Sequence, residues 1–216
     1  LKALSEARLS PYHPGRGILP SPWKYKIDAK EGDEANAVVT FGWKDWDAGM
    51  QKVLDEYNFN TFIFTIPGFS SAKFADPSKK HVFHGREEGT PGYEALVSKY
   101  LGGIEAHLKE KGWLDVAYLY WYDEPTVKSY PNVIEGMNLL KETMPGVKRL
   151  LTEQPEAALL GHTDIWCPMP HYMHTEHEQT CRDAGEEFWW YLCPDPKAPY
   201  FGEFIDRAGA ELRLWG

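Results

Sequence analysis

Residues 118–125 read YLYWYDEP, and this segment decides the fold. Four of its first five residues are aromatic, as expected of a buried strand. The strand must end at Pro125, because proline has no backbone N–H to donate and holds the preceding residue extended. The segment therefore places two adjacent carboxylates, Asp123 and Glu124, at the carboxyl end of a strand and beside several aromatic rings.

Helices and strands alternate along the rest of the chain, which favours a parallel α/β sheet. We expect six strands, at residues 37–41, 61–66, 116–122, 148–152, 165–168 and 188–193. Helices are expected at residues 1–9, 45–57, 92–111, 132–144, 176–185 and 204–215, with a long polar loop at 69–91. This rhythm predicts one (β/α)8 TIM-barrel-like domain over residues 1–216, with catalytic groups where its strands end. Six strands do not close an eight-stranded barrel, so we expect an incomplete barrel whose open edges favour a homo-oligomer.

The composition is that of a globular domain, with 43% hydrophobic and 25% charged residues among 216. A net charge of −9 repels phosphate backbones and argues against nucleic acid as a partner. No stretch approaches the roughly 18 apolar residues that a membrane span needs, so we expect no membrane partner. The nine tryptophans and twelve tyrosines could stack against sugar rings, although such residues also fill ordinary cores.

Five segments resemble the catalytic domain of glycoside hydrolase family 123, whose members are β-N-acetylgalactosaminidase-like barrels. These segments are His107–Trp113, Tyr118–Pro125, Asp164–Pro168, Trp190–Cys193 and Arg213–Gly216. The resemblance implies retaining, substrate-assisted hydrolysis of β-linked N-acetylhexosamine glycosides, with N-acetylgalactosamine as the model sugar. In that mechanism the 2-acetamido oxygen of the sugar attacks the anomeric carbon, and no cofactor is required.

The resemblance also gives each acid a role. Glu124 would be the general acid/base, and Asp123 would accept a hydrogen bond from the acetamido N–H and stabilise the oxazolinium intermediate. Neighbouring side chains of a regular strand point to opposite faces, so both acids reach one sugar only if the backbone leaves strand geometry there. If alternation holds, Tyr120 and Tyr122 share the face of Glu124, and Trp121 faces the helices.

Further aromatic residues lie near the ends of the later expected strands, where a sugar pocket would form. With Tyr120 and Tyr122, the predicted substrate-binding residues are Trp166, Tyr172, Trp190 and Tyr191. For each ring, a role in the core is an equally good interpretation.

Three alternatives stay open. The chain could be a hydrolase of another specificity on the same scaffold, or a carbohydrate-binding remnant without catalysis. A third reading is a metal site at His162, His171, His174 and His177. The chain has no HExxH spacing, however, and its cysteines (Cys167, Cys181 and Cys193) have no CxxC spacing. The sequence therefore favours no metal site and inert thiols.

Overall fold

The computed structural model describes residues 2–6, 20–69, 80–173 and 176–191. Its centre is a sheet of five parallel strands: β3 (Phe62–Ile63), β6 (Ala117–Tyr122), β7 (Lys148–Leu151), β8 (Ile165–Trp166) and β9 (Glu187–Phe188). The strands lie side by side in chain order, as consecutive strands of a (β/α)8 barrel do. The α/β class is confirmed. Among these described strands, β3 and β9 do not pair with each other, so the sheet is open there.

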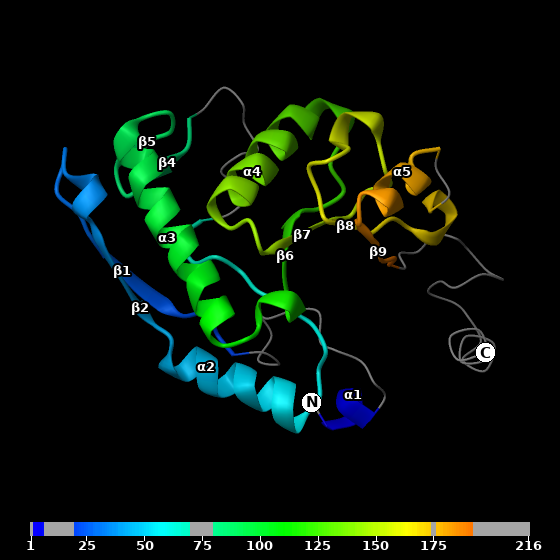
Figure 1. Cartoon of the computed structure of the whole chain (residues 1–216), viewed down its shortest axis with the longest axis horizontal. Coiled ribbons are helices and arrows are strands. Elements are labelled where there is room, and N and C mark those ends of the chain that lie inside the picture. Colours follow the sequence, from blue (N-terminus) through cyan, green and yellow to red (C-terminus); the bar gives the residue numbers. More distant parts are fainter. Residues whose placement is uncertain (1, 7–19, 70–79, 174–175, 192–216) are drawn as a thin grey trace.

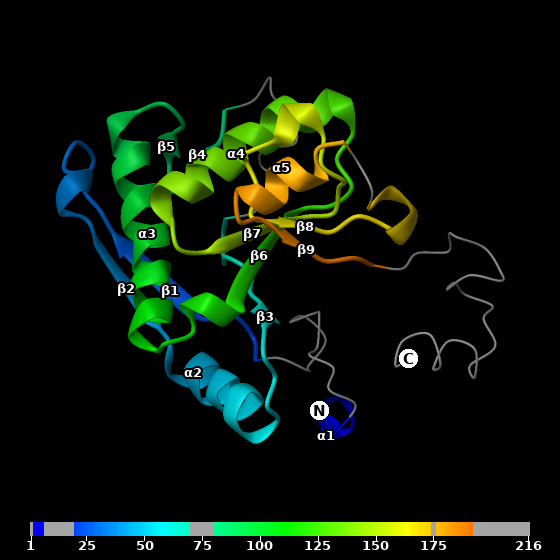
Figure 2. The same ribbon diagram turned by 45° about the vertical axis from the view of Figure 1, so that its right-hand side comes forward.

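Helices precede the strands as the sequence predicts. α3 (Pro91–Glu110) leads to β6, α4 (Tyr130–Thr143) to β7, and α5 (Glu178–Asp183) to β9. Figure 2 shows α4 and α5 on one side of strands β7 to β9. The start of α3 has a clear cause, because Pro91 occupies its first turn and the Thr90 hydroxyl accepts the Tyr93 N–H at 3.3 Å.

The N-terminal part forms an antiparallel hairpin instead of a strand of the main sheet. After α1 (Lys2–Glu6), β1 (Lys24–Asp28) pairs with β2 (Val38–Gly42). The assignment of residues 37–41 to the parallel sheet was therefore wrong, and the described part of that sheet has five strands rather than the six expected. β1 escaped prediction because only two of its five residues, Tyr25 and Ile27, are apolar.

Aromatic stacking attaches this hairpin to the rest of the protein. The Phe41 ring stacks on Trp43 with centroids 4.7 Å apart and on Tyr100 of α3 with centroids 5.7 Å apart. In Figure 1, α3 lies between the hairpin and α4. The chain continues from β2 into α2 (Lys44–Gln51) and a π-helical turn (Lys52–Glu56), so the helix predicted at 45–57 is confirmed.

The described part of the expected 69–91 loop contains a second hairpin. β4 (Val82–Phe83) pairs with β5 (Arg86–Glu87) across the two residues His84 and Gly85. Both turn residues have positive φ, 47° and 77°, as a type I′ hairpin turn requires. The expectation of an irregular loop was wrong at this point.

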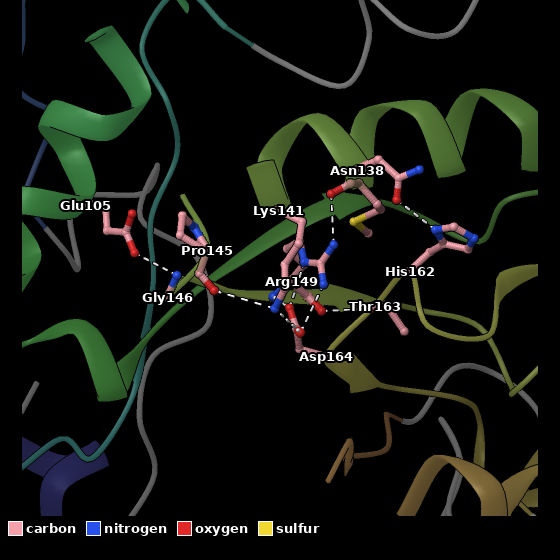
Figure 3. Close-up of polar contacts among 10 residues, drawn as sticks. Glu105, Asn138, Lys141, Pro145, Gly146, Arg149, His162, Thr163 and Asp164 are labelled. Atoms are coloured by element: carbon pink, nitrogen blue, oxygen red, sulfur yellow. Dashed lines mark hydrogen bonds and ion pairs between the residues drawn. The ribbon is translucent and has the colours of Figure 1, made fainter. Parts of the chain in front are cut away.

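A buried arginine of β7 forms an ion pair with Asp164, the residue before β8, and a hydrogen bond with α4 (Figure 3). Arg149, only 2% exposed, contacts the Asp164 carboxylate through Nε at 2.7 Å and Nη2 at 3.0 Å, while Nη1 donates to the Met137 carbonyl at 2.8 Å. Burial alone would raise the pKa of Asp164, but the hydrogen bonds and charge of Arg149 outweigh it and hold that pKa below its ordinary value. The pair fixes β7, whose carboxyl end reaches the candidate site.

Some expectations fall wholly or partly outside the described residues, among them parts of the helix at 1–9 and of the loop at 69–91. The helix at 204–215 lies wholly outside the described residues. Of the expected 188–193 strand, residues 188–191 are described and only Phe188 belongs to β9, so that strand is shorter than predicted, while 192 and 193 lie outside the described residues. Within the described ranges, none of the helices combines the length and apolar character that crossing a bilayer demands.

Candidate active site

Strand β6 contains a bulge that separates its tyrosines. Tyr120 pairs with Leu150 of β7, whereas Tyr122 pairs with the very next residue, Leu151. One residue of β6, Trp121, is therefore extra and reverses the alternation. The Tyr122 hydroxyl donates to the Asn132 carbonyl of α4 at 2.9 Å, while the Tyr120 hydroxyl donates to Asp123. The expectation that Tyr120 and Tyr122 share a face was wrong.

The backbone leaves strand geometry immediately after β6, as two convergent acids require. Glu124 has φ = 40°, a left-handed conformation that is rare and strained for a residue other than glycine. Pro125 therefore does not hold Glu124 extended, and that detail of the sequence argument was wrong. The end of the strand before Pro125 is confirmed, since β6 stops at Tyr122.

Thr152, the first residue after β7, connects the two acids. Its hydroxyl accepts the Glu124 backbone N–H at 2.8 Å and lies 3.3 Å from Asp123 Oδ1. The Tyr120 hydroxyl donates to the same Asp123 oxygen at 2.5 Å. On the other side, the Tyr191 hydroxyl donates to Glu124 Oε1. The ends of β6 and β7 and the segment after β9 thus meet at one place.

Two adjoining hollows open beside these carboxylates. The first, of about 370 Å³, is mainly aromatic and is lined by Tyr118, Tyr120, Leu150, Thr152, Cys167, Trp189, Trp190 and Tyr191. The second, of about 340 Å³, is more polar and is lined by Glu124, Thr152, Glu153, Gln154, Pro168, Met169, Tyr172 and Tyr191. Thr152 and Tyr191 belong to both, so they mark the boundary between the hollows.

The comparisons with known proteins agree with this architecture. The family model described as glycoside hydrolase 123, catalytic domain, matches residues 35–216. The chain belongs to this family. No curated protein matches the chain.

A solved structure extends the comparison of this family 123 chain. It comes from a structural analysis of a family 123 glycoside hydrolase from Clostridium perfringens that concerns glycolipid glycan hydrolysis. The two structures superpose with a TM-score of 0.51 and 15% sequence identity, over 84% of this chain and 33% of the other. At that identity the likeness shows a shared fold, and this chain spans a third of its relative's length.

The structure brings some of the predicted family 123 site residues together. Tyr120 and Tyr191 bond to Asp123 and Glu124 respectively, and Trp190 lines the first hollow with 45% of its surface exposed. Tyr172, 48% exposed, lines the second hollow.

Two predicted site residues lie elsewhere. Tyr122 lies against α4, as its hydrogen bond to Asn132 shows. Trp166 is fully buried, and its Nε1 donates to Glu186 Oε2 at 2.5 Å. The core interpretation of Trp166 is therefore the correct one. Cys167, the residue directly after β8, lines the first hollow, so alternation turns its neighbour Trp166 to the other face of the sheet.

Sequence reasoning missed several residues that line the hollows, above all Thr152 and Trp189. Thr152 could have been found, since the strand predicted at 148–152 ends on it beside β6. Trp189 is held in place by its backbone. Its N–H donates to the Trp166 carbonyl at 2.8 Å, which extends the β8–β9 pairing by one hydrogen bond. Its ring meets Tyr118 edge-on with centroids 4.9 Å apart.

A third carboxylate, Glu153, lies in the second hollow. Burial raises the pKa of Glu153 above that of an ordinary carboxyl, and the negative charges of Glu156 and Glu124 add to this effect, while the Gln154 N–H opposes it.

The histidines considered for a metal site are engaged separately. His162 Nδ1 lies 2.7 Å from Asn138 Oδ1, and the His171 ring lies against Tyr172 with centroids 4.0 Å apart. His174 lies outside the described residues. In residues 2–6, 20–69, 80–173 and 176–191, no three His, Cys, Asp or Glu side chains are grouped as a metal ion would need.

The described cysteines are buried. Burial raises the pKa of the Cys167 thiol to about 11 and that of the Cys181 thiol to about 12. A thiol with such a pKa stays protonated near neutral pH and is a poor nucleophile. Cys193 lies outside the described residues.

Proposed function

We propose that this chain carries the acid/base centre of a retaining glycoside hydrolase acting on β-linked N-acetylhexosaminides, N-acetylgalactosaminides in particular. The observation that carries the proposal is the position of Asp123 and Glu124. Both follow the end of one parallel strand and are tied to each other through Thr152, which lines both hollows, and Glu124 itself lines the second hollow. Membership of family 123 supports the reaction class.

The sugar's own acetamido group would be the nucleophile in this reaction. Asp123 Oδ1 already accepts the Tyr120 hydroxyl hydrogen and lies near that of Thr152. Oδ2 would therefore accept the acetamido N–H, which orients the carbonyl oxygen toward the anomeric carbon and stabilises the positive oxazolinium. Glu124 would protonate the leaving oxygen and then take a proton from the attacking water.

The first hollow is mainly aromatic and the second is more polar, so we assign the terminal sugar to the first and the leaving group to the second. Aromatic rings in the first hollow offer stacking surfaces for the terminal sugar ring, beside Tyr120, which bonds to Asp123. Glu124 lines the second hollow, so the leaving group would lie there. Glu153 and Gln154 would then offer polar partners to its hydroxyl groups.

Hydrolysis of a chromogenic aryl β-N-acetylgalactosaminide tests the proposal. Glu124→Gln and Asp123→Asn should each lower kcat by at least about 100-fold. Glu142→Gln, which removes a carboxylate from the exposed surface of α4, is the matched control and should act like the wild type. An aryl β-galactoside without the acetamido group should not be hydrolysed. Full activity of Glu124→Gln would contradict the proposal.

A carbohydrate-binding protein without catalysis is the second candidate. It is favoured by the exposed rings of Trp190 and Tyr172, which offer stacking surfaces for a sugar. Such a protein would bind N-acetylgalactosamine, measured by calorimetry, with equal affinity when Glu124 is replaced by Gln, and would release no aryl alcohol.

A further inference from the structure

Thr152 occupies the point where the two acids, both hollows and strands β6 and β7 meet. Its side chain is polar but only 9% exposed. Its hydroxyl oxygen lies 2.8 Å from the Glu124 backbone nitrogen, 3.3 Å from Asp123 Oδ1 and 3.2 Å from the Tyr120 hydroxyl. A buried hydroxyl with three polar neighbours, here in β6 and in the two residues after it, has a defined orientation.

The hydrogens of these groups can be assigned. A hydroxyl carries one hydrogen, and that of Tyr120 is donated to Asp123 Oδ1 at 2.5 Å. The Thr152 hydroxyl hydrogen is donated to the same carboxylate oxygen, 3.3 Å away. A lone pair of Thr152 accepts the Glu124 N–H. Thr152 thus acts on one acid as a donor and on the other as an acceptor.

The bond to Glu124 falls where the backbone most needs support. With φ = 40°, Glu124 adopts a conformation that persists only when its surroundings impose it. The angle φ describes rotation about the N–Cα bond of Glu124. The N–H that Thr152 accepts belongs to the nitrogen of that bond. The same conformation turns the Glu124 side chain toward the second hollow, where Tyr191 meets it.

We propose that Thr152 is a positioning residue of the acid pair: its hydroxyl fixes the left-handed backbone of Glu124 and the rotamer of Asp123 in one hydrogen-bonded unit. Its catalytic consequence rests on the proposed function, because it assumes that these acids perform the reaction. Thr152 itself touches no reacting atom in this proposal.

Thr152→Val is the decisive variant, because it keeps the branched shape and removes the hydroxyl. Charged hydrogen bonds contribute enough that we expect kcat to fall roughly 10- to 100-fold, with KM nearly unchanged. Thr152→Ser, which keeps the hydroxyl, should recover most of kcat. Thr163→Val is the matched control: Thr163 is also buried and donates to the Arg149 carbonyl at 2.8 Å, away from the acids. It should leave kcat unchanged.

The outcomes separate this proposal from the proposed function. If the wild-type chain hydrolyses no N-acetylhexosaminide, the proposed function fails, and crystal structures of Thr152→Val and Thr152→Ser still decide the backbone claim. Glu124 should lose its positive φ in the first and keep it in the second. If Thr152→Val does not fold, Thr152→Cys, a weak donor and acceptor, replaces it. An unchanged φ, or equal kcat for the Val and Ser variants, would overturn the role of Thr152.

Discussion

The hydroxyl of Tyr122 fills the space that a side chain at Gly136 would need. A Cβ on Gly136 would lie 2.3 Å from that hydroxyl oxygen and 3.2 Å from Trp121 Nε1. The bulge in β6 turns Tyr122 toward α4, and a glycine in the middle of that helix makes room for it. The register of β6 and the glycine at position 136 of α4 thus depend on each other.

Gly136→Ala should therefore destabilise the fold, although alanine is the better helix former. Overpacking typically costs about 1–3 kcal/mol, which exceeds the roughly 1 kcal/mol gained from helix propensity. Gly102→Ala in α3 is the control. Its Cβ would meet only the Thr143 carbonyl, at 3.8 Å, so this variant should stabilise the fold. Urea unfolding measures both. Adding Tyr122→Phe to Gly136→Ala should recover part of the loss, and a stabilising Gly136→Ala would refute the relationship.

Arg149→Met should cost about 3–5 kcal/mol of unfolding free energy, because it leaves the partly buried Asp164 carboxylate with only the longer contact to Lys141, at 3.6 Å, in place of the Arg149 guanidinium. Arg182→Met is the comparison, since Arg182 pairs with Glu178 on the surface of α5 and should cost about 0.5 kcal/mol or less. Because the folded pKa of Asp164 is lowered, the pair stabilises at neutral pH, and this contribution is lost as pH falls below the ordinary carboxyl pKa of about 4. Equal losses for both variants would contradict the burial argument.

Glu153 should make the fold less stable as pH rises. Its folded pKa is raised, so the folded state binds the proton more tightly than the unfolded state, and stability falls as pH increases from about 4 through the folded pKa. At pH 7, Glu153→Gln should raise Tm by about 2–4 °C, and at pH 4 it should not. Glu142→Gln serves as the control for removal of one surface charge. A Tm gain that did not depend on pH would exclude this explanation.

Trp190 and Trp166 should respond oppositely to truncation. Trp190→Ala removes an exposed ring from the first hollow, so we expect weaker binding of N-acetylgalactosamine, by about 10-fold, with little change in Tm. Trp166→Ala removes a fully buried ring and should cost about 3–5 kcal/mol of stability. Calorimetric titration and thermal melts distinguish the two. Loss of stability in Trp190→Ala would place that ring in the core instead.

Secondary structure was predictable wherever local signals were strong. α3 begins at a proline after a capping threonine, and β6 is an aromatic run that ends before Asp123. The hairpins were not predictable in the same way. β1 carries only two apolar residues, and β4 and β5 have two residues each. Segments this short or this polar show too little alternation of apolar and polar residues to be recognised as strands.

The sequence by itself determined that Asp123 and Glu124 would end a buried strand in a parallel α/β domain, because proline chemistry and aromatic burial are local. Only the tertiary structure decided which rings surround them. A single extra residue in β6 turned Tyr122 to the helices, and alternation in β8 buried Trp166. Side-chain direction depends on register with a neighbouring strand, and that pairing joins residues far apart in the chain, as Thr152 and Glu124 are.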